Sequence, residues 1–64
     1  MKVLLVDGVG NAVVYERSQE VLWVETPGGH VFVKTCEIVE GMEVYRLKGS
    51  GAPAVRHIYP RLAA

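Results

Sequence analysis

Short apolar runs alternate with turn-forming residues along the whole chain. The runs are rich in Val, Tyr, Trp and Phe, and clusters of Gly, Pro, Asn and Ser separate them at close spacing. This pattern is typical of an all-β sandwich or small barrel. No stretch keeps the apolar period of a helix, so any helix should be a single turn. Five strands are expected, with residues 54–59 as a candidate sixth: Lys2 to Val6, Ala12 to Glu16, Val21 to Thr26, His30 to Cys36 and Met42 to Lys48.

The best-defined element is a hairpin around Pro27-Gly28-Gly29. A two-residue loop gives this hairpin one aliphatic face and one mixed face, whereas a three-residue loop opposes Val24 to Phe32 and mixes the two. The sequence therefore favours the two-residue loop. The aliphatic face, taken as the core, then carries Leu22, Val24, Val31, Val33 and Thr35, and the mixed face carries Val21, Trp23, Glu25, His30, Phe32, Lys34 and Cys36.

The mixed face is the first candidate for a functional surface. Trp23 and Phe32 together would expose more contiguous apolar area than a monomer usually tolerates, which implies a partner. Burial of both rings inside a closed barrel is the alternative, and the sequence does not decide between them. If the face is exposed, contact between copies of the chain is favoured over a ligand site.

Two other strands differ in how clearly they show a buried face. Val3-Leu4-Leu5-Val6 is apolar on both faces, which indicates a central strand or one covered by a neighbouring subunit. The strand from Met42 alternates poorly. Either Met42 and Val44 point inward, or Tyr45 and Leu47 form the buried set.

The charges are segregated along the chain although the total is zero. All seven acidic residues lie in positions 1–43, which carry a net charge of −4, and the remaining residues carry +4. This asymmetry indicates that the end of the chain meets something anionic: nucleic acid, an acidic protein or the acidic part of a second copy.

The basic C-terminal segment, residues 49–64, begins with a Gly/Pro connector after a β domain of residues 1–48. Basic residues interleaved with aromatic ones suit a phosphate backbone and stacked bases. The near-neutral isoelectric point instead favours docking on an acidic surface, with RNA or DNA binding as the alternative. The candidate binding residues, counting the hairpin, are Trp23, Phe32, Lys34, Arg46, Lys48, Arg56, His57, Tyr59 and Arg61.

Part of this segment resembles a known family. Ala52-Pro53-Ala54-Val55 followed by Ile58-Tyr59-Pro60-Arg61-Leu62 is similar to the tail of the carbon-storage-regulator family of RNA-binding proteins. The resemblance implies a small, cytoplasmic, intertwined β dimer that binds RNA. Those proteins bind RNA through arginines on the first strand, where this chain has Leu5, Val6 and Asp7, so the resemblance transfers no binding residue.

Nothing in the chain points to catalysis, and neither a metal nor another cofactor is expected. Cys36, His30 and His57 are the only soft metal ligands, and their spacing forms no close ligand pair or nucleophile pair. A lone cysteine excludes an internal disulfide. The loop Asp7 to Asn11 superficially resembles a phosphate-binding loop but lacks a following helix, so a hairpin turn is expected there.

Size and composition point to association. A chain this short buries only about 60% of its unfolded surface on folding, and half of its residues are apolar. A homo-oligomer is therefore expected. Neither a secretory signal nor a membrane span is visible, which favours the cytoplasm. A short β protein of this kind would also suit a phage or mobile-element product.

The sequence thus predicts a small antiparallel β domain, an SH3-like fold or a small open barrel, that self-associates. It is predicted to be a non-catalytic binding and assembly module that docks a protein partner through an aromatic patch and the basic C-terminal segment. The alternative function is RNA or DNA binding through the same segment.

Overall fold

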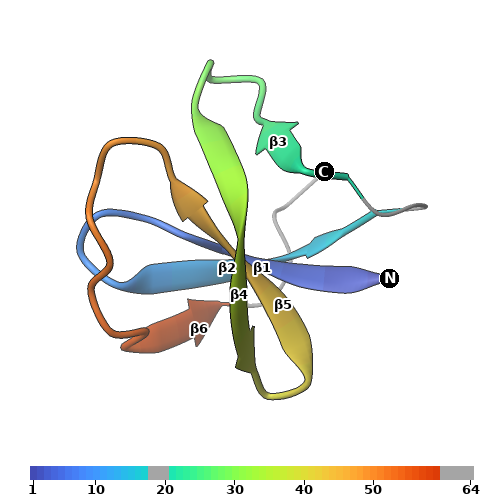
Figure 1. Cartoon of the computed structure of the whole chain (residues 1–64), viewed down its shortest axis with the longest axis vertical. Helices are drawn as coiled ribbons and strands as arrows, with labels where there is room; N and C mark the ends of the chain where they lie inside the picture. The colour runs from blue at the N-terminus through green and yellow to red at the C-terminus, as the bar shows by residue number, and fades with distance from the viewer. Residues whose placement is uncertain (18–20, 60–64) are drawn as a thin grey trace.

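The computed structural model describes residues 1–17 and 21–59 of the chain. In this part of the chain the regular structure is entirely β, which confirms the all-β prediction. The strands form a single sheet in the order β3-β4-β5-β1-β2-β6, and the sheet curls into a half-barrel (Figure 1). Its strands are β1 (Lys2–Val6), β2 (Asn11–Glu16), β3 (Trp23–Glu25), β4 (Val31–Val39), β5 (Met42–Leu47) and β6 (His57–Tyr59). No helix in the described ranges is long and apolar enough to cross a membrane.

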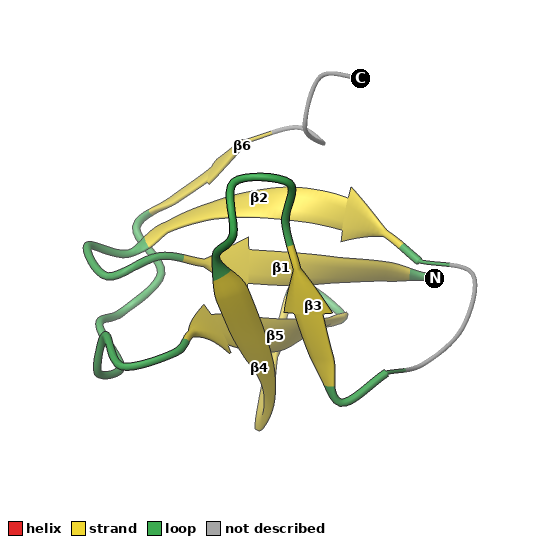
Figure 2. Cartoon of the chain, turned by 90° about the horizontal axis from the view of Figure 1, so that it is seen from above, coloured by secondary structure: helices red, strands yellow, loops and turns green. Residues whose placement is uncertain are grey.

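The sheet is mixed, so the prediction of a purely antiparallel domain is wrong. β1 pairs in parallel with β5, and β2 pairs in parallel with β6. The β1–β2 hairpin and the β3–β4–β5 meander are each antiparallel, and they join side by side through β1 and β5. β3 and β6 remain the two edges of the sheet, so the barrel is open rather than closed (Figure 2).

Strand β1 occupies the centre of the sheet, as its apolar sequence predicts. It lies between β5 and β2, and the side chains from Val3 to Val6 are at most 2% exposed. Because alternate residues of a strand point to opposite faces, β1 contributes to two separate core clusters. The first core cluster contains Val3, Leu5, Val24 and Tyr45, and the second contains Leu4, Val6, Ala12 and Val44.

Strand β5 resolves the ambiguity of its alternation by burying both faces. Val44 and Tyr45, which are neighbours in sequence, belong to different core clusters. The hydroxyl group of Tyr45 donates a hydrogen bond to the carbonyl of Val21, which ties the entry to β3 onto the first core cluster. Each of the two alternatives for β5 therefore describes only half of the strand.

The loop between β1 and β2 is a hairpin turn, as expected. The Asp7 carboxylate accepts hydrogen bonds from the backbone N–H groups of Val9 and Asn11, at 3.0 and 2.9 Å. Gly10 adopts a φ of 96°, and a Cβ built there would lie 2.4 Å from the carbonyl oxygen of Ala54. Glycine is therefore required where the connector to β6 crosses this turn.

The hairpin between β3 and β4 has a three-residue loop, so the two-residue prediction is wrong. Val24 pairs with Phe32, and the N–H of Thr26 donates to the carbonyl of His30 at 2.9 Å. Gly29, the third loop residue, has a φ of 84°, which matches the three-residue hairpin loop that ends in a left-handed residue. This register places Trp23 and Phe32 on opposite faces of the sheet.

Candidate functional site

The corrected register exposes an apolar surface on the outside of the β3–β4 hairpin. Trp23 is 56% exposed, Leu22 is 74% exposed and Val33 is 41% exposed. Together with half-buried Val31, these side chains form what we call the Trp23 surface. Trp23 and Val33 are directly opposed across the two strands, so their side chains share one face.

A shallow depression of about 380 Å³ lies on this surface, and two charged residues complete it. Its lining includes Glu25 of β3 and Lys48, the residue that follows β5. An apolar centre with a polar rim is the usual composition of a protein contact surface.

Phe32 does not belong to this surface, in contrast to the expected pairing of the two aromatic residues. It points to the other face of the hairpin and packs half-buried against the first core cluster, which also contains Val24. The sequence left open whether both rings were core or surface. The structure divides them: Phe32 supports the core and Trp23 lies outside.

The backbone of β3 is unpaired along its outer edge. The carbonyl of Leu22 accepts a hydrogen bond from Lys34 N–H of β4 at 2.9 Å, and Thr26 N–H donates to the carbonyl of His30, just before β4, at 2.9 Å. In an antiparallel ladder the bonded residues alternate with residues whose N–H and C=O groups point away from the partner strand. Trp23 and Glu25 are those alternate residues. Their backbone groups therefore point to the free edge, and in the described part of the chain nothing bonds to them.

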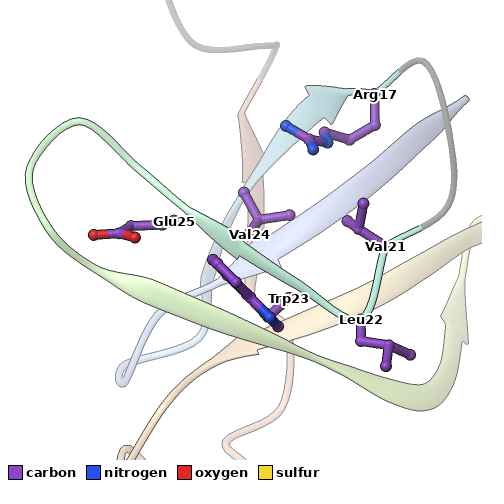
Figure 3. Close-up of a pocket in the computed structure, with 6 residues that line it drawn as sticks. All are labelled: Arg17, Val21, Leu22, Trp23, Val24 and Glu25. Atoms are coloured by element: carbon purple, nitrogen blue, oxygen red, sulfur yellow. The ribbon is translucent and has the colours of Figure 1, made fainter.

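A second depression, which we call the edge hollow, runs along this free edge. It has a volume of about 490 Å³, and its lining consists of Arg17 and the consecutive residues 21–25 (Figure 3). Side chains on both faces of a strand line the same space only if that space lies beside the strand. The edge hollow is therefore room next to the backbone of β3.

Arg17 borders the edge hollow from the end of β2. Its guanidinium carbon lies 5.8 Å from the centre of the Tyr15 ring, a cation–π contact. The N–H of Arg17 donates to the carbonyl of Met1 at 2.8 Å, and the amino terminus donates back to the carbonyl of Arg17 at 2.7 Å. These bonds fix the backbone of Arg17 at the margin of the sheet.

Two of the expected binding cations are engaged within the molecule. Arg46 is 9% exposed and donates to both carboxylate oxygens of Glu37 at 2.6 and 2.8 Å. It also donates to the carbonyl of Pro53 at 2.6 Å. Lys34 forms an ion pair with Glu43 at 3.2 Å. Arg46 in particular serves the fold, because it ties the connector of the basic C-terminal segment to β5.

The contact between Arg46 and Glu37 depends on an irregularity in β4. The register of β4 against β5 shifts between Lys34 and Ile38, and in this bulge the Thr35 hydroxyl group accepts a hydrogen bond from the N–H of Glu37 at 3.1 Å. Hydrogen bonding from Arg46 lowers the pKa of Glu37 below its usual value, and the same bond raises the pKa of Arg46. Both groups are therefore ionised over the whole physiological range.

Residues 56–59 of the basic C-terminal segment lie at the opposite edge of the sheet, in and next to β6. Arg56, His57 and Tyr59 are exposed, and the rings of His57 and Tyr59 are 6.2 Å apart. Lys48 lies apart from them, on the rim of the Trp23 surface. Arg61 falls outside the described residues. The basic and aromatic residues that were expected to form one binding surface therefore lie on separate parts of the sheet.

The residues named in the sequence as possible metal ligands do not gather in the structure. Cys36 is exposed and free, and no group of three or more His, Cys, Asp or Glu side chains lies close enough to hold a metal ion in the described ranges.

Sequence reasoning missed two parts of this site. Leu22, Val31 and Val33 were expected in the core but line the Trp23 surface, and the free backbone of β3 was not considered. The position of Val31 and Val33 beside Trp23 follows from the loop length, and its signal was present in the Pro27-Gly28-Gly29 sequence, because Pro followed by a terminal Gly suits a three-residue loop. The free backbone follows instead from the position of β3 at the edge of the sheet.

The chain was compared with known protein families, curated proteins and solved structures. No family model, no curated protein and no solved structure matches the chain. The resemblance of the C-terminal segment to the carbon-storage-regulator family is thus not accompanied by a family match.

Proposed function

We propose that the protein is a non-catalytic binding and assembly module whose main contact is the Trp23 surface. The observation that carries this proposal is the exposure of Leu22, Trp23 and Val33 side by side at one edge of the sheet. A Trp residue offers a large contact area at a small entropic cost, and it is enriched at the energetic centres of protein interfaces.

Residues 1–17 and 21–59 offer little else that could cover these side chains. A domain of this size has a small core, and both core clusters already use β1 and β5. Desolvation of the Trp23 surface by a second protein surface stabilises the complex in proportion to the apolar area removed from water. Lys48 and Glu25 on the rim supply orientation and discrimination against wrong partners.

The basic C-terminal segment contributes a separate contact in this proposal. Arg56 is exposed near the connector, far in the sheet order from β3. It docks on an acidic surface of a partner or of another copy, and this contact weakens as salt screens the charges.

Fluorescence of the single tryptophan tests the proposal directly, because Trp23 is both the reporter and the centre of the surface. We expect the emission of Trp23 to shift to shorter wavelength as the protein is concentrated from low micromolar to millimolar, since self-association removes water from the indole. Leu22→Ser and Val33→Ser should abolish the shift while leaving the reporter in place.

Ile38→Ser is the matched control, because Ile38 is 67% exposed on β4 but does not line the Trp23 surface. This variant should keep the wild-type shift. An emission maximum that stays constant over the whole concentration range, together with a monomeric mass by light scattering, would contradict assembly through this surface.

A second candidate function is RNA or DNA binding through β6. The specific observation in its favour is the tilted pair of His57 and Tyr59 rings beside exposed Arg56, because aromatic rings and cations together bind single strands. Binding of a labelled oligonucleotide that weakens steeply with salt and is lost in Arg56→Ala would establish it. We rank it second because Arg46 and Lys34 are paired with carboxylates.

A further inference from the structure

We infer that the partner of the free β3 edge is the β3 edge of a second copy, so that two half-barrels join into one continuous sheet. This inference rests on the proposed assembly function and specifies its geometry. The two strands run antiparallel about a twofold axis at Val24. Trp23 of each copy then lies opposite Glu25 of the other.

The backbone of β3 is complementary to itself in this register. The outward-pointing N–H and C=O groups belong to Trp23 and Glu25, the residues on either side of Val24. An axis at Val24 brings Trp23 opposite Glu25 twice, and both pairs then exchange N–H···O=C hydrogen bonds in the antiparallel pattern. All the outward groups of β3 are satisfied by the same groups of the second copy, which is the condition for a closed dimer.

The side chains agree with the same register. Trp23 and Glu25 lie on the outer face of β3, and neither the indole N–H nor the Glu25 carboxylate has a hydrogen-bond partner among the described residues. Cross-strand neighbours have their Cβ atoms about 5 Å apart. The indole of one copy therefore reaches the carboxylate of the other and donates to it, so each copy supplies the group that the other lacks.

The edge hollow provides the room for this strand. Its lining follows residues 21–25 along the free edge, so no described side chain or loop fills the space beside the outward backbone groups. Among the described residues, β3 has neither a proline nor an inward-pointing charge, and no loop covers its edge; an edge of this kind accepts another strand. Because only three residues pair on each side, the interface is small, and we expect dissociation in the micromolar range.

The first experiment separates the backbone of the edge from its side chain. Glu25→Pro removes the outward N–H and leaves the bonds between β3 and β4 intact, because the N–H of Glu25 does not point to β4. Glu25→Thr removes the carboxylate and keeps the N–H. Sedimentation equilibrium should show a dimer weakened at least tenfold by the proline, because two hydrogen bonds between the copies are lost, and weakened less by the threonine.

The second experiment tests the register by cross-linking in a Cys36→Ser background. Leu22 of one copy lies opposite Thr26 of the other, at a non-hydrogen-bonded pair where a disulfide fits. A mixture of Leu22→Cys and Thr26→Cys proteins should oxidise to a mixed disulfide dimer faster than either variant alone. Circular dichroism of each variant confirms that it is folded.

The outcomes distinguish this inference from the proposed function. Loss of the dimer in Leu22→Ser with an unchanged dimer in both Glu25 variants, and with no preference for the mixed disulfide, would retain the Trp23 surface and overturn the pairing of edges. A wild-type protein that stays monomeric at millimolar concentration would overturn both the pairing of β3 edges and self-association through the Trp23 surface. The partner would then be another protein or nucleic acid.

Discussion

The two edge strands of the sheet, β3 and β6, are equal in length but differ in how much of each is in contact with the rest of the fold. β6 packs Ile58 against the second core cluster, and its approach is held by hydrogen bonds from Arg56 N–H to Gly10 and from Arg46 to Pro53. β3 buries Val24 in the first core cluster but exposes Trp23 and its outer backbone.

The difference shows what each edge contributes. β6 is the last of the described strands in the sequence. Its residue Ile58 and Val55 of its connector cover the second core cluster. Its removal would expose Leu4 and Val6 to water. β3 contributes only the side chain of Val24 to the first core cluster, and the outward-facing Trp23 remains exposed to solvent. One edge therefore completes the fold, and the other is available for contact.

The largest loss of stability on the β6 side should come from Gly10→Ala. The new Cβ would lie 2.4 Å from the carbonyl oxygen of Ala54, at a φ of 96°. We expect a loss of about 1–3 kcal/mol, measured by urea unfolding. Gly29→Ala is the control, because Gly29 also has a positive φ but has open space around it. Equal losses in both variants would mean that the contact with the connector is not tight.

Arg46→Met should have the next largest effect, because it releases the connector from β5. The variant loses the hydrogen bond to Pro53, worth about 1 kcal/mol, as well as its contact with Glu37. The melting temperature should fall, and hydrogen exchange should rise at Ile58 more than at Val24. A uniform rise at both edges would contradict a local role for Arg46.

A smaller effect is expected from the pH dependence of the same ion pair. The folded state lowers the pKa of Glu37, so it binds the proton less readily than the unfolded state does. The stabilisation is therefore fully present above the usual glutamate pKa and is lost as the pH falls through the lower pKa of the folded protein. Glu37→Gln should flatten the acid limb of the stability profile. If the unfolding free energies of wild type and variant fell in parallel with decreasing pH, the ion pair of Glu37 with Arg46 would not be the source of the acid dependence.

The smallest effect on stability should come from the β3 side. Leu22→Ser changes a side chain that is 74% exposed, so the unfolding free energy of the monomer should change by no more than about 0.5 kcal/mol. The same variant should lose self-association. If Leu22→Ser lowers the unfolding free energy as much as Gly10→Ala does, then Leu22 supports the fold, and the two edges do not differ in their contribution to stability.

Sequence patterns revealed those parts of the molecule that are specified locally. The turn from Asp7 to Asn11 and the buried strand Lys2–Val6 were predicted correctly, because the turn residues and the apolar run are each contained in one short segment. The parallel pairing of β1 with β5 could not be predicted, since alternation sets which face a strand buries but does not set its neighbour.

The site was only partly predictable for the same reason. Trp23 was a candidate contact residue whose exposure the sequence left open, and the structure shows it exposed. The hairpin register was wrong because a pure aliphatic face was preferred over the geometry that Gly29 permits. Arg46 was counted among the free cations because its partner Glu37 lies nine residues away across a bulge, and no local pattern shows such a pair.

The central position of β1 also has a consequence for how the chain is made. β1 is synthesised before the other described strands, yet its parallel neighbour β5 follows about forty residues later. Until then the β1–β2 hairpin has two apolar faces and an open side, which is a substrate for chaperones and a site for aggregation. Such long-range pairing also slows folding to about the millisecond-to-second range. The yield of folded protein should therefore depend on how fast residues 42–47 follow the first two strands.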